Sequence, residues 1–353
     1  MIKKIFFSAA VLFAGISTAT ADTVLRFADG APNRGTRSDA VVHFFDEVTR
    51  LSEGDLKFDP HWGGAMFDYT TVGDGVSSGS VDLGSVAGAY NPRKLKAITI
   101  CYLTLAEYAD PWVGMRAMYE LMTTNQAIQD MLAKENLVYI TGFSSTGIQF
   151  ECGGKNVIRT VEDIKGKRIR AISNWIPVLK GLGANIVNLG AGEIYQALDT
   201  GLLDCSASYI YSIRTLKTHE VINSLTIADW GQFSGFVMAM NLDTWNDLTE
   251  KQQKILRQAG SEMIDFFGET QIAEMDDVVE GLRTGSIGSK VSVYELPAEE
   301  REKLTLASEK YAPSWAESVN KDGLPGDQIW SEYESMLKKY EAERIALGYP
   351  WER

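Results

Sequence analysis

The chain has 353 residues, and 34 Lys and Arg stand against 47 Asp and Glu, which gives a formal net charge of −13. Such an acidic protein is a poor candidate for nucleic-acid binding, which needs a basic face. A hydrophobic content of 45% is ordinary for a globular protein, and the length favours two domains. We therefore expect a two-domain globular protein that binds no nucleic acid.

The first 21 residues have the pattern of a cleaved secretory signal peptide. Lys3 and Lys4 give a positive start, residues 5–16 form an apolar stretch, and residues 19–21 form a small-residue cleavage site. The apolar stretch is too short to span a membrane, and no later segment is apolar enough to do so. We expect the mature protein to be exported to the periplasm and not to be embedded in the membrane.

The next part of the chain alternates between strand and helix patterns. The order β-α-β-α-β over residues 22–90 is typical of a parallel sheet covered by helices. Two more helices and a strand follow. The predicted strands are 23–27, 56–62, 81–86 and 137–143, and the predicted helices are 38–51, 68–77, 112–122 and 125–135.

A second unit begins near Thr146 and alternates in the same way. Residues 236–241 then form a strand that we expect to return the chain to the first domain. The predicted strands of the second unit are 168–172, 185–189 and 205–209, and its predicted helices are 161–165, 175–182 and 192–200.

An unusually long helical pattern follows, from Thr249 to about Arg283, without a proline and with only three glycines. Thr249 is a suitable N-cap. At 1.5 Å per residue such a helix would be about 50 Å long, so it would have to lie across both domains. The alternative is a pair of helices broken at Gly268. Further helices are expected over 311–331 and 333–347.

Four short motifs follow one another in the second unit. The first, Asp163-Ile-Lys-Gly-Lys-Arg-Ile-Arg170, is a basic turn leading into a short strand that carries Arg170. A guanidinium group is planar, permanently charged and forked, so it suits bidentate binding of a carboxylate. The alternative is a solvated basic loop. The other motifs are Gly181-Leu-Gly-Ala-Asn185, Glu193-Ile-Tyr-Gln-Ala-Leu198 and Gly201-Leu-Leu-Asp204.

This succession resembles the solute-binding subunits of tripartite ATP-independent periplasmic (TRAP) transporters, the DctP-like family. The resemblance implies an α/β fold of two domains, with a cleft between them and a long helix spanning both. It implies that Arg170 grips the carboxylate of a small organic acid. It also implies delivery to a membrane permease that an ion gradient drives, with no catalysis and no cofactor. We expect a monomer.

The domains expected from this resemblance divide the chain at five places. Residues 1–21 are the signal peptide and 326–353 a C-terminal helix. The first domain is 22–145, completed by 235–265, and the second is 146–234, completed by 266–325.

The sequence departs from the family's pattern at two positions. Many members have a second arginine about 20 residues before the first, but Phe150 stands there in this chain. Members also often have an asparagine where this chain has Ser208. A second anion contact is therefore in doubt, and a bulky dicarboxylate or sugar acid is less expected as the ligand.

The remaining ligand contacts are predicted from residue type and place. An aromatic wall beside an arginine suits a compact carboxylate or sulfonate with a cationic or apolar body, because rings attract cations. Core packing is the alternative for each aromatic residue. The predicted contacts are Ser208 and Gln149 as hydrogen-bond donors, Phe150, Trp175, Tyr209 and Trp230 as walls, and Asp68, with Asp29 as a weaker candidate, for a donor or cation.

Two other classes of protein are weighed against a TRAP subunit. Residues 75–79 match the G-x-S-x-G motif of hydrolases, but Ser77 follows a polar helical stretch instead of a buried strand. An exported hydrolase is therefore disfavoured. A binding protein of an ATP-driven importer, or a ligand sensor, is the remaining alternative, and the long helix argues against the importer.

Cysteines and histidines give no site pattern. The three histidines are isolated and lack the spacing of metal ligands, so no metal is expected. Three cysteines permit one disulfide in an oxidising compartment, although three buried thiols are the favoured interpretation.

Overall fold

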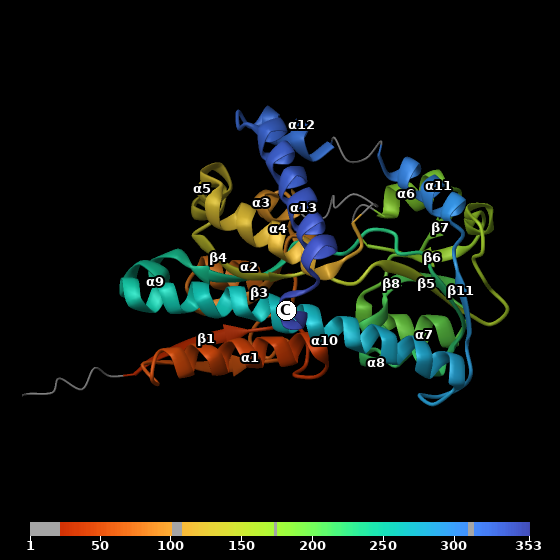
Figure 1. The fold of residues 1–353 in the computed structure, drawn as a ribbon, viewed down its shortest axis with the longest axis horizontal. Coiled ribbons are helices and arrows are strands. Elements are labelled where there is room, and N and C mark those ends of the chain that lie inside the picture. The colour runs from red at the N-terminus through yellow and green to blue at the C-terminus, as the bar shows by residue number, and fades with distance from the viewer. Residues whose placement is uncertain (1–21, 101–107, 173–174, 310–313) are drawn as a thin grey trace, which may run out of the picture.

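The computed structural model describes residues 22–100, 108–172, 175–309 and 314–353, and it has an α/β fold built on two sheets (Figure 1). The strand orders are β2-β1-β3-β10-β4 and β11-β9-β5-β8-β6-β7. The predicted signal peptide and Cys101 lie outside the described residues. Within the described residues, no helix combines the length and the apolar character needed to cross a bilayer.

The first sheet confirms the predicted strand order at the start of the chain. Strand β1 pairs in parallel with β2 and β3, whereas β10 is antiparallel to β3 and β4, so the chain returns to this sheet as expected. The strands are β1 Thr23–Ala28, β2 Leu56–His61, β3 Leu83–Ala87, β4 Leu137–Phe143 and β10 Phe236–Asn241. Its helices are α1 Thr36–Leu51, α2 Val72–Ser77, η1 Gly88–Tyr90, α3 Lys96–Thr99, α4 Pro111–Thr124, α5 Gln126–Lys134 and α9 Leu242–Asp247.

The second sheet contains three strands that the sequence analysis did not predict: β5, β9 and β11. Strand β5 is central and antiparallel to both β8 and β9, while β6 is parallel to β8. The strands are β5 Ile148–Gly153, β6 Arg168–Arg170, β7 Asn185–Ile186, β8 Cys205–Tyr209, β9 Ile222–Ile227 and β11 Ser292–Glu295. The helices are η3 Val161–Ile164, α6 Trp175–Gly181, η4 Ala191–Glu193, α7 Ile194–Asp199, α8 Ile210–Thr215, η5 Thr218–Glu220 and α11 Ala298–Glu309.

The long helix is present and unbroken. Helix α10, Glu250–Thr284, has 35 residues and continues through Gly268. The Thr249 side chain caps its start, and its C-cap is Gly285 in the left-handed conformation. Figure 1 shows α10 passing alongside elements of both sheets. Its first half packs into the core of the first sheet, and its second half packs in a core cluster with α7, α8 and β9 of the second. The prediction of a helix across both domains is confirmed.

The predicted domain division needs one correction near the C-terminus. It assigned 266–325 to the second domain, but α12, Ser314–Lys321, packs in the core of the first. The reason is local, since Trp315 is buried there and its Nε1 donates to the carbonyl of Lys96 at 2.9 Å. Helix α13, Gly326–Leu347, and η6, Pro350–Glu352, follow.

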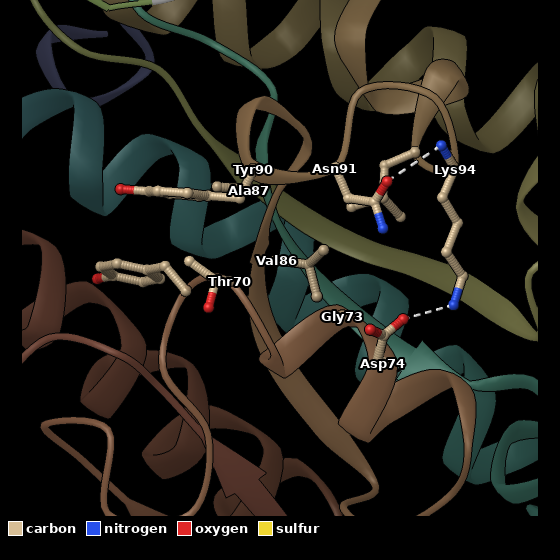
Figure 2. Close-up of a pocket in the computed structure, with 10 residues that line it drawn as sticks. Thr70, Gly73, Asp74, Val86, Ala87, Tyr90, Asn91 and Lys94 are labelled. Atoms are coloured by element: carbon tan, nitrogen blue, oxygen red, sulfur yellow. Dashed lines mark hydrogen bonds and ion pairs between the residues drawn. The ribbon is translucent and has the colours of Figure 1, made fainter. Parts of the chain in front are cut away.

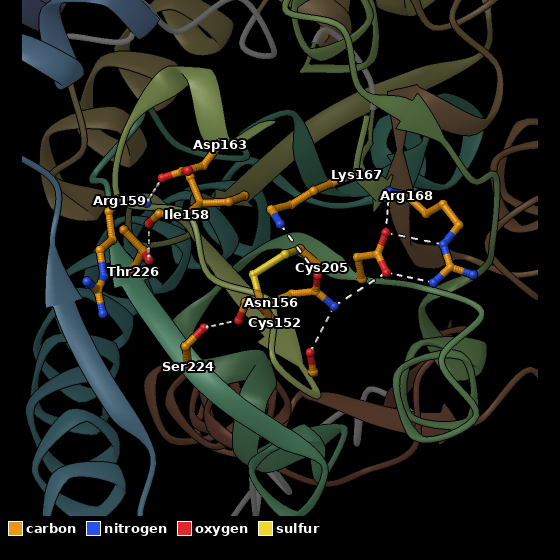
Figure 3. The surroundings of a disulfide bond; sticks show 12 residues. Cys152, Asn156, Ile158, Arg159, Asp163, Lys167, Arg168, Cys205, Ser224 and Thr226 are labelled. Carbon is orange, nitrogen blue, oxygen red and sulfur yellow. Dashed lines mark hydrogen bonds and ion pairs between the residues drawn. A yellow bond between two sulfur atoms is a disulfide. The ribbon is translucent and has the colours of Figure 1, made fainter. Parts of the chain in front are cut away.

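A disulfide joins Cys152 on β5 to Cys205 on β8 (Figure 3). These residues are direct partners in the antiparallel ladder, which brings the two side chains together. The favoured expectation of three free thiols was therefore wrong. It failed because β5 was not predicted, so nothing in the sequence placed Cys152 beside Cys205.

Candidate functional site

A cavity of about 560 Å³ lies where residues of the two sheets meet. Its walls come from segments that follow β1, β3, β6 and β8, so it is at the carboxyl ends of parallel strands, where open α/β sheets usually bind ligands. The volume is in the range typical of small-molecule sites. The lining residues include 31–37, 87–90, 170–172 and 208–216 in part.

Arg170 ends β6 and lines this cavity. Its side chain is largely buried, and its Nε donates to the carbonyl of Leu189 at 3.4 Å. Burial lowers the pKa of Arg170, while Tyr209, Tyr90 and Glu151 partly oppose this shift. No ion pair found among the described residues includes Arg170. Because burying a charge without a counter-ion is costly, a bound anion would be stabilised here.

Aromatic side chains form most of the remaining wall. The rings of Tyr69 and Tyr90 are stacked with centroids 5.9 Å apart, and those of Tyr209 and Tyr211 are 4.5 Å apart. Rings from both sheets therefore surround the space next to Arg170, which suits a flat apolar ligand body. The aromatic lining residues are Tyr69, Tyr90, Phe143, Tyr209, Tyr211, Phe233 and Phe236.

A second, much smaller hollow shares Tyr69, Ala87 and Tyr90 with the lining of the large cavity (Figure 2). It has a volume of about 10 Å³ and is bordered by an ion pair of 2.6 Å between Lys94 and Asp74. A volume of this size holds one water at most. It is therefore no ligand site.

Two further arginines, Arg34 and Arg37, also line the cavity, and the sequence analysis predicted neither. Arg37, at the start of α1, forms a two-pronged ion pair with Asp29, with N···O distances of 2.7 and 3.0 Å. The Tyr69 hydroxyl donates to the same carboxylate at 3.0 Å. Burial alone would lower the pKa of Arg37, but Asp29 and Tyr69 more than offset this and raise it. Arg37 is therefore a cation whose counter-ion is already in the protein.

Among the predicted contacts, Arg170, Ser208 and Tyr209 line the cavity together. The hydroxyl groups of Ser208 and Ser212 are 2.9 Å apart and share a hydrogen bond. The ligand contacts of these residues stay a prediction.

Three predicted aromatic walls lie in the core of the second domain instead. Phe150 is fully buried and stacks on Trp230, and the Trp175 Nε1 donates to the carbonyl of Trp230 at 3.3 Å. The Trp230 Nε1 in turn donates to Ser308 at 2.9 Å. The alternative of core packing therefore applies to these three, because they pack with each other beneath the cavity lining.

Gln149 and Asp68 also differ from their expected roles. Gln149 accepts hydrogen bonds from the backbone of Ala228 and Asp229 at 2.6 and 2.9 Å, so it holds the segment that follows β9 in place. Asp68 is exposed and accepts hydrogen bonds from Thr70 and Thr71, which lower its pKa. Neither residue is part of the cavity lining. Asp68 closes a turn before α2, and this explains why the helix starts later than predicted.

Glu151 is a buried acid on β5 whose charge acts on Arg170. Its carboxylate accepts a hydrogen bond of 2.5 Å from Thr218. Burial raises the pKa of Glu151 to about 7, against the opposing effects of Thr218 and Arg170. Near neutral pH this group is therefore partly protonated, and it neutralises Arg170 only in part.

The raised pKa of Glu151 predicts a loss of stability with rising pH. The folded protein binds a proton that the unfolded chain releases above pH 4.5, so the free energy of unfolding falls between about pH 4.5 and 7. The expected fall is about 3 kcal/mol. Glu151→Gln should flatten this part of the profile, measured by urea unfolding from pH 4.5 to 8. Equal slopes in variant and wild type would contradict the assignment.

The two sheets, the cavity between them and the helix across both define a two-domain solute-binding protein. Residues 27–322 match the family model for DctP, the bacterial extracellular solute-binding proteins of family 7. The chain therefore belongs to this family of TRAP solute-binding proteins, as the motifs predicted. Membership of this family confirms the expected class, a binding protein and not an enzyme. Accordingly, Ser77 ends helix α2 and does not follow a strand.

Individual relatives agree with the family. A solute-binding protein of Albidiferax ferrireducens is 26% identical over 276 residues, which cover 75% of this chain and 78% of that protein. A TRAP periplasmic protein of Desulfovibrio salexigens has the same fold, with a TM-score of 0.80 at 20% identity over 91% of this chain and 97% of that one. A TRAP protein of Rhodoferax ferrireducens, solved with copurified benzoate, gives a TM-score of 0.78 at 20% identity over 91% and 99%.

Proposed function

We propose that this protein captures a small organic monocarboxylate in the periplasm and delivers it to the permease of a TRAP transporter. The observation that carries the proposal is Arg170, a buried guanidinium at the wall of an aromatic cavity. The ligand carboxylate would replace the water that Arg170 has lost and would pair with both prongs of the guanidinium. Residues 1–21 would direct export.

The lining chemistry favours an apolar ligand body over a cationic one. Among the described residues, no Asp or Glu lines the cavity. Asp29, the acid that pairs with the lining residue Arg37, is fully buried and already held in that ion pair. Contact with an aromatic ring alone stabilises a bound cation by about 0.5–2 kcal/mol. A zwitterion, which the sequence left open, is thus less well supported than a monoanion with an aromatic or aliphatic body.

The structure with bound benzoate from Rhodoferax ferrireducens supports this choice by analogy, since that protein shares the fold. Benzoate combines one carboxylate with one flat ring. These are the two features that Arg170 and the aromatic lining would recognise in this chain.

A thermal-shift screen of residues 22–353 tests the proposal. The acids should include benzoate, hydroxybenzoates, 2-oxo acids, dicarboxylates, sulfonates and ectoine. At about 100 times the dissociation constant, a ligand adds about 2.7 kcal/mol to the free energy of unfolding. We expect a rise of several degrees with monocarboxylates. If no acid raises the melting temperature of protein refolded free of copurified ligand, the proposal is wrong.

A further inference from the structure

Three arginines of the described chain line the cavity, but their charges differ in availability. Arg34, just before α1, is exposed to solvent and donates to the carbonyl of Thr215 at 3.2 Å. Arg170 comes from β6 of the second sheet and Arg37 from the start of α1 beside the first. Arg170 and Arg37 are largely buried, and two buried cations would normally suggest a ligand with an anion at each end, because each guanidinium can hold one carboxylate. The surroundings of Arg37 remove this possibility.

Asp29 neutralises Arg37 and, together with two hydroxyl groups, accepts the hydrogen bonds of its terminal nitrogens. The Nη1 of Arg37 donates to Asp29 at 2.7 Å and to Ser85 at 3.4 Å. The Nη2 donates to Asp29 at 3.0 Å and to Tyr69 at 3.1 Å. Both terminal nitrogens therefore have two oxygen partners within the protein. The guanidinium also lies over the ring of Phe236, with its carbon 4.8 Å from the ring centroid.

The Asp29 carboxylate is held firmly in place. It is fully buried, and besides Arg37 it accepts hydrogen bonds from the backbone of Ala31 at 2.7 Å and from the Tyr69 hydroxyl at 3.0 Å. A ligand carboxylate could reach Arg37 only by displacing this network. Otherwise it would be buried close to the charge of Asp29, where like charges repel strongly.

We propose that the Asp29–Arg37 pair makes the buried wall across from Arg170 electrically neutral, and that it selects against ligands with a second carboxylate that would be buried against this wall. The inference rests on the function proposed above and adds a rule of selectivity to it. Such dicarboxylates are disfavoured because Arg37, the second buried cation of the cavity, already has a carboxylate from the protein. Asp29 thus acts as a specificity residue without touching the carboxylate that Arg170 binds.

Isothermal titration with a matched pair of ligands tests this rule. Benzoate and isophthalate differ only by a second carboxylate on the ring. Wild type should bind benzoate at least about a hundredfold more tightly, because the second carboxylate of isophthalate would be buried without a counter-ion. Asp29→Asn keeps the shape of the side chain but frees the charge of Arg37. In this variant, affinity for isophthalate should rise by about tenfold or more, the least expected for a close charge pair.

The double variant Asp29→Asn/Arg37→Met is the control, because it also lacks Asp29 but has no cation to offer. It should show no gain for isophthalate. An equal gain in the double variant, or no gain in a folded Asp29→Asn protein, would overturn the rule. If Asp29→Asn does not fold, the ratio of the wild-type affinities for benzoate and isophthalate decides. Near-equal affinities for the two ligands would refute the rule. Failure of the proposed function is distinct, because then wild type binds neither benzoate nor any other acid of the screen.

Discussion

Replacing Arg170 with alanine is expected to weaken binding of the organic acid by about 2–5 kcal/mol, the range seen when one partner of a buried charge pair is removed. Without the guanidinium, the ligand carboxylate would be buried among tyrosine rings with no counter-charge. The same change should not lower the stability of the ligand-free protein, because burial already disfavours the charged form of Arg170 and lowers its pKa.

Titration calorimetry with the best acid of the screen measures this loss. Arg168→Ala is a matched control on the same strand, because Arg168 pairs with Asp204 at 2.6 Å, is 46% exposed and does not line the cavity. Arg170→Lys should give an intermediate affinity, since lysine keeps the charge but not the fork. Equal affinities for Arg170→Ala and wild type would show that Arg170 does not bind the ligand.

Loss of the Cys152–Cys205 disulfide is expected to lower the free energy of unfolding by about 4 kcal/mol, from the entropy of closing a loop of this length. The two cysteines are 53 residues apart and enclose β6 and β7. Because this loop carries Arg170 and most of the second-domain wall, reduction should destabilise that half of the cavity first.

Thermal unfolding with and without dithiothreitol checks this prediction, and the double variant Cys152→Ser/Cys205→Ser should be insensitive to the reductant. A count of free thiols in the denatured protein provides the second reading. With three cysteines in the chain, one free thiol is expected before reduction and three after. Three free thiols in protein isolated from the periplasm would contradict the disulfide.

Sequence patterns predicted the first domain better than the second, for a physical reason. Helix α10 is long and has a clear N-cap, and strands β1 and β4 have the β-branched and aromatic residues typical of strands. These features made the three elements predictable. By contrast, β5 is buried on both faces and yet carries Gln149, Glu151 and Cys152, so it lacks the usual alternation. Strand β11 has four residues at a sheet edge, too few for a pattern.

The candidate site was predictable only in part. Arg170 stands at the end of a motif and at the end of a strand, so both local sequence and sheet geometry indicate it. The cavity lies at strand ends, which explains why Tyr209 lines it and Phe150, in the middle of β5, does not. Which end or face of a strand meets a cleft depends on tertiary packing, and residue type alone cannot show it.

The Asp29–Arg37 pair had no sequence signal beyond the position of Asp29 after β1. The two residues are eight positions apart, on either side of an irregular turn, and only the placement of α1 against the sheet brings them together. An arginine near a helix start is usually solvated, so nothing marked Arg37 as part of a cavity. The selectivity rule therefore depends on the structure and not on the motifs.

A crystal structure of the protein with the best-binding acid of the screen tests the central claim most directly. The account predicts one ligand in the cavity, with its carboxylate within hydrogen-bond distance of both prongs of Arg170 and its body between the tyrosine rings. The ion pair between Asp29 and Arg37 should remain intact beside the uncharged end. A ligand whose carboxylate pairs with Arg37, or lies away from Arg170, would contradict the account.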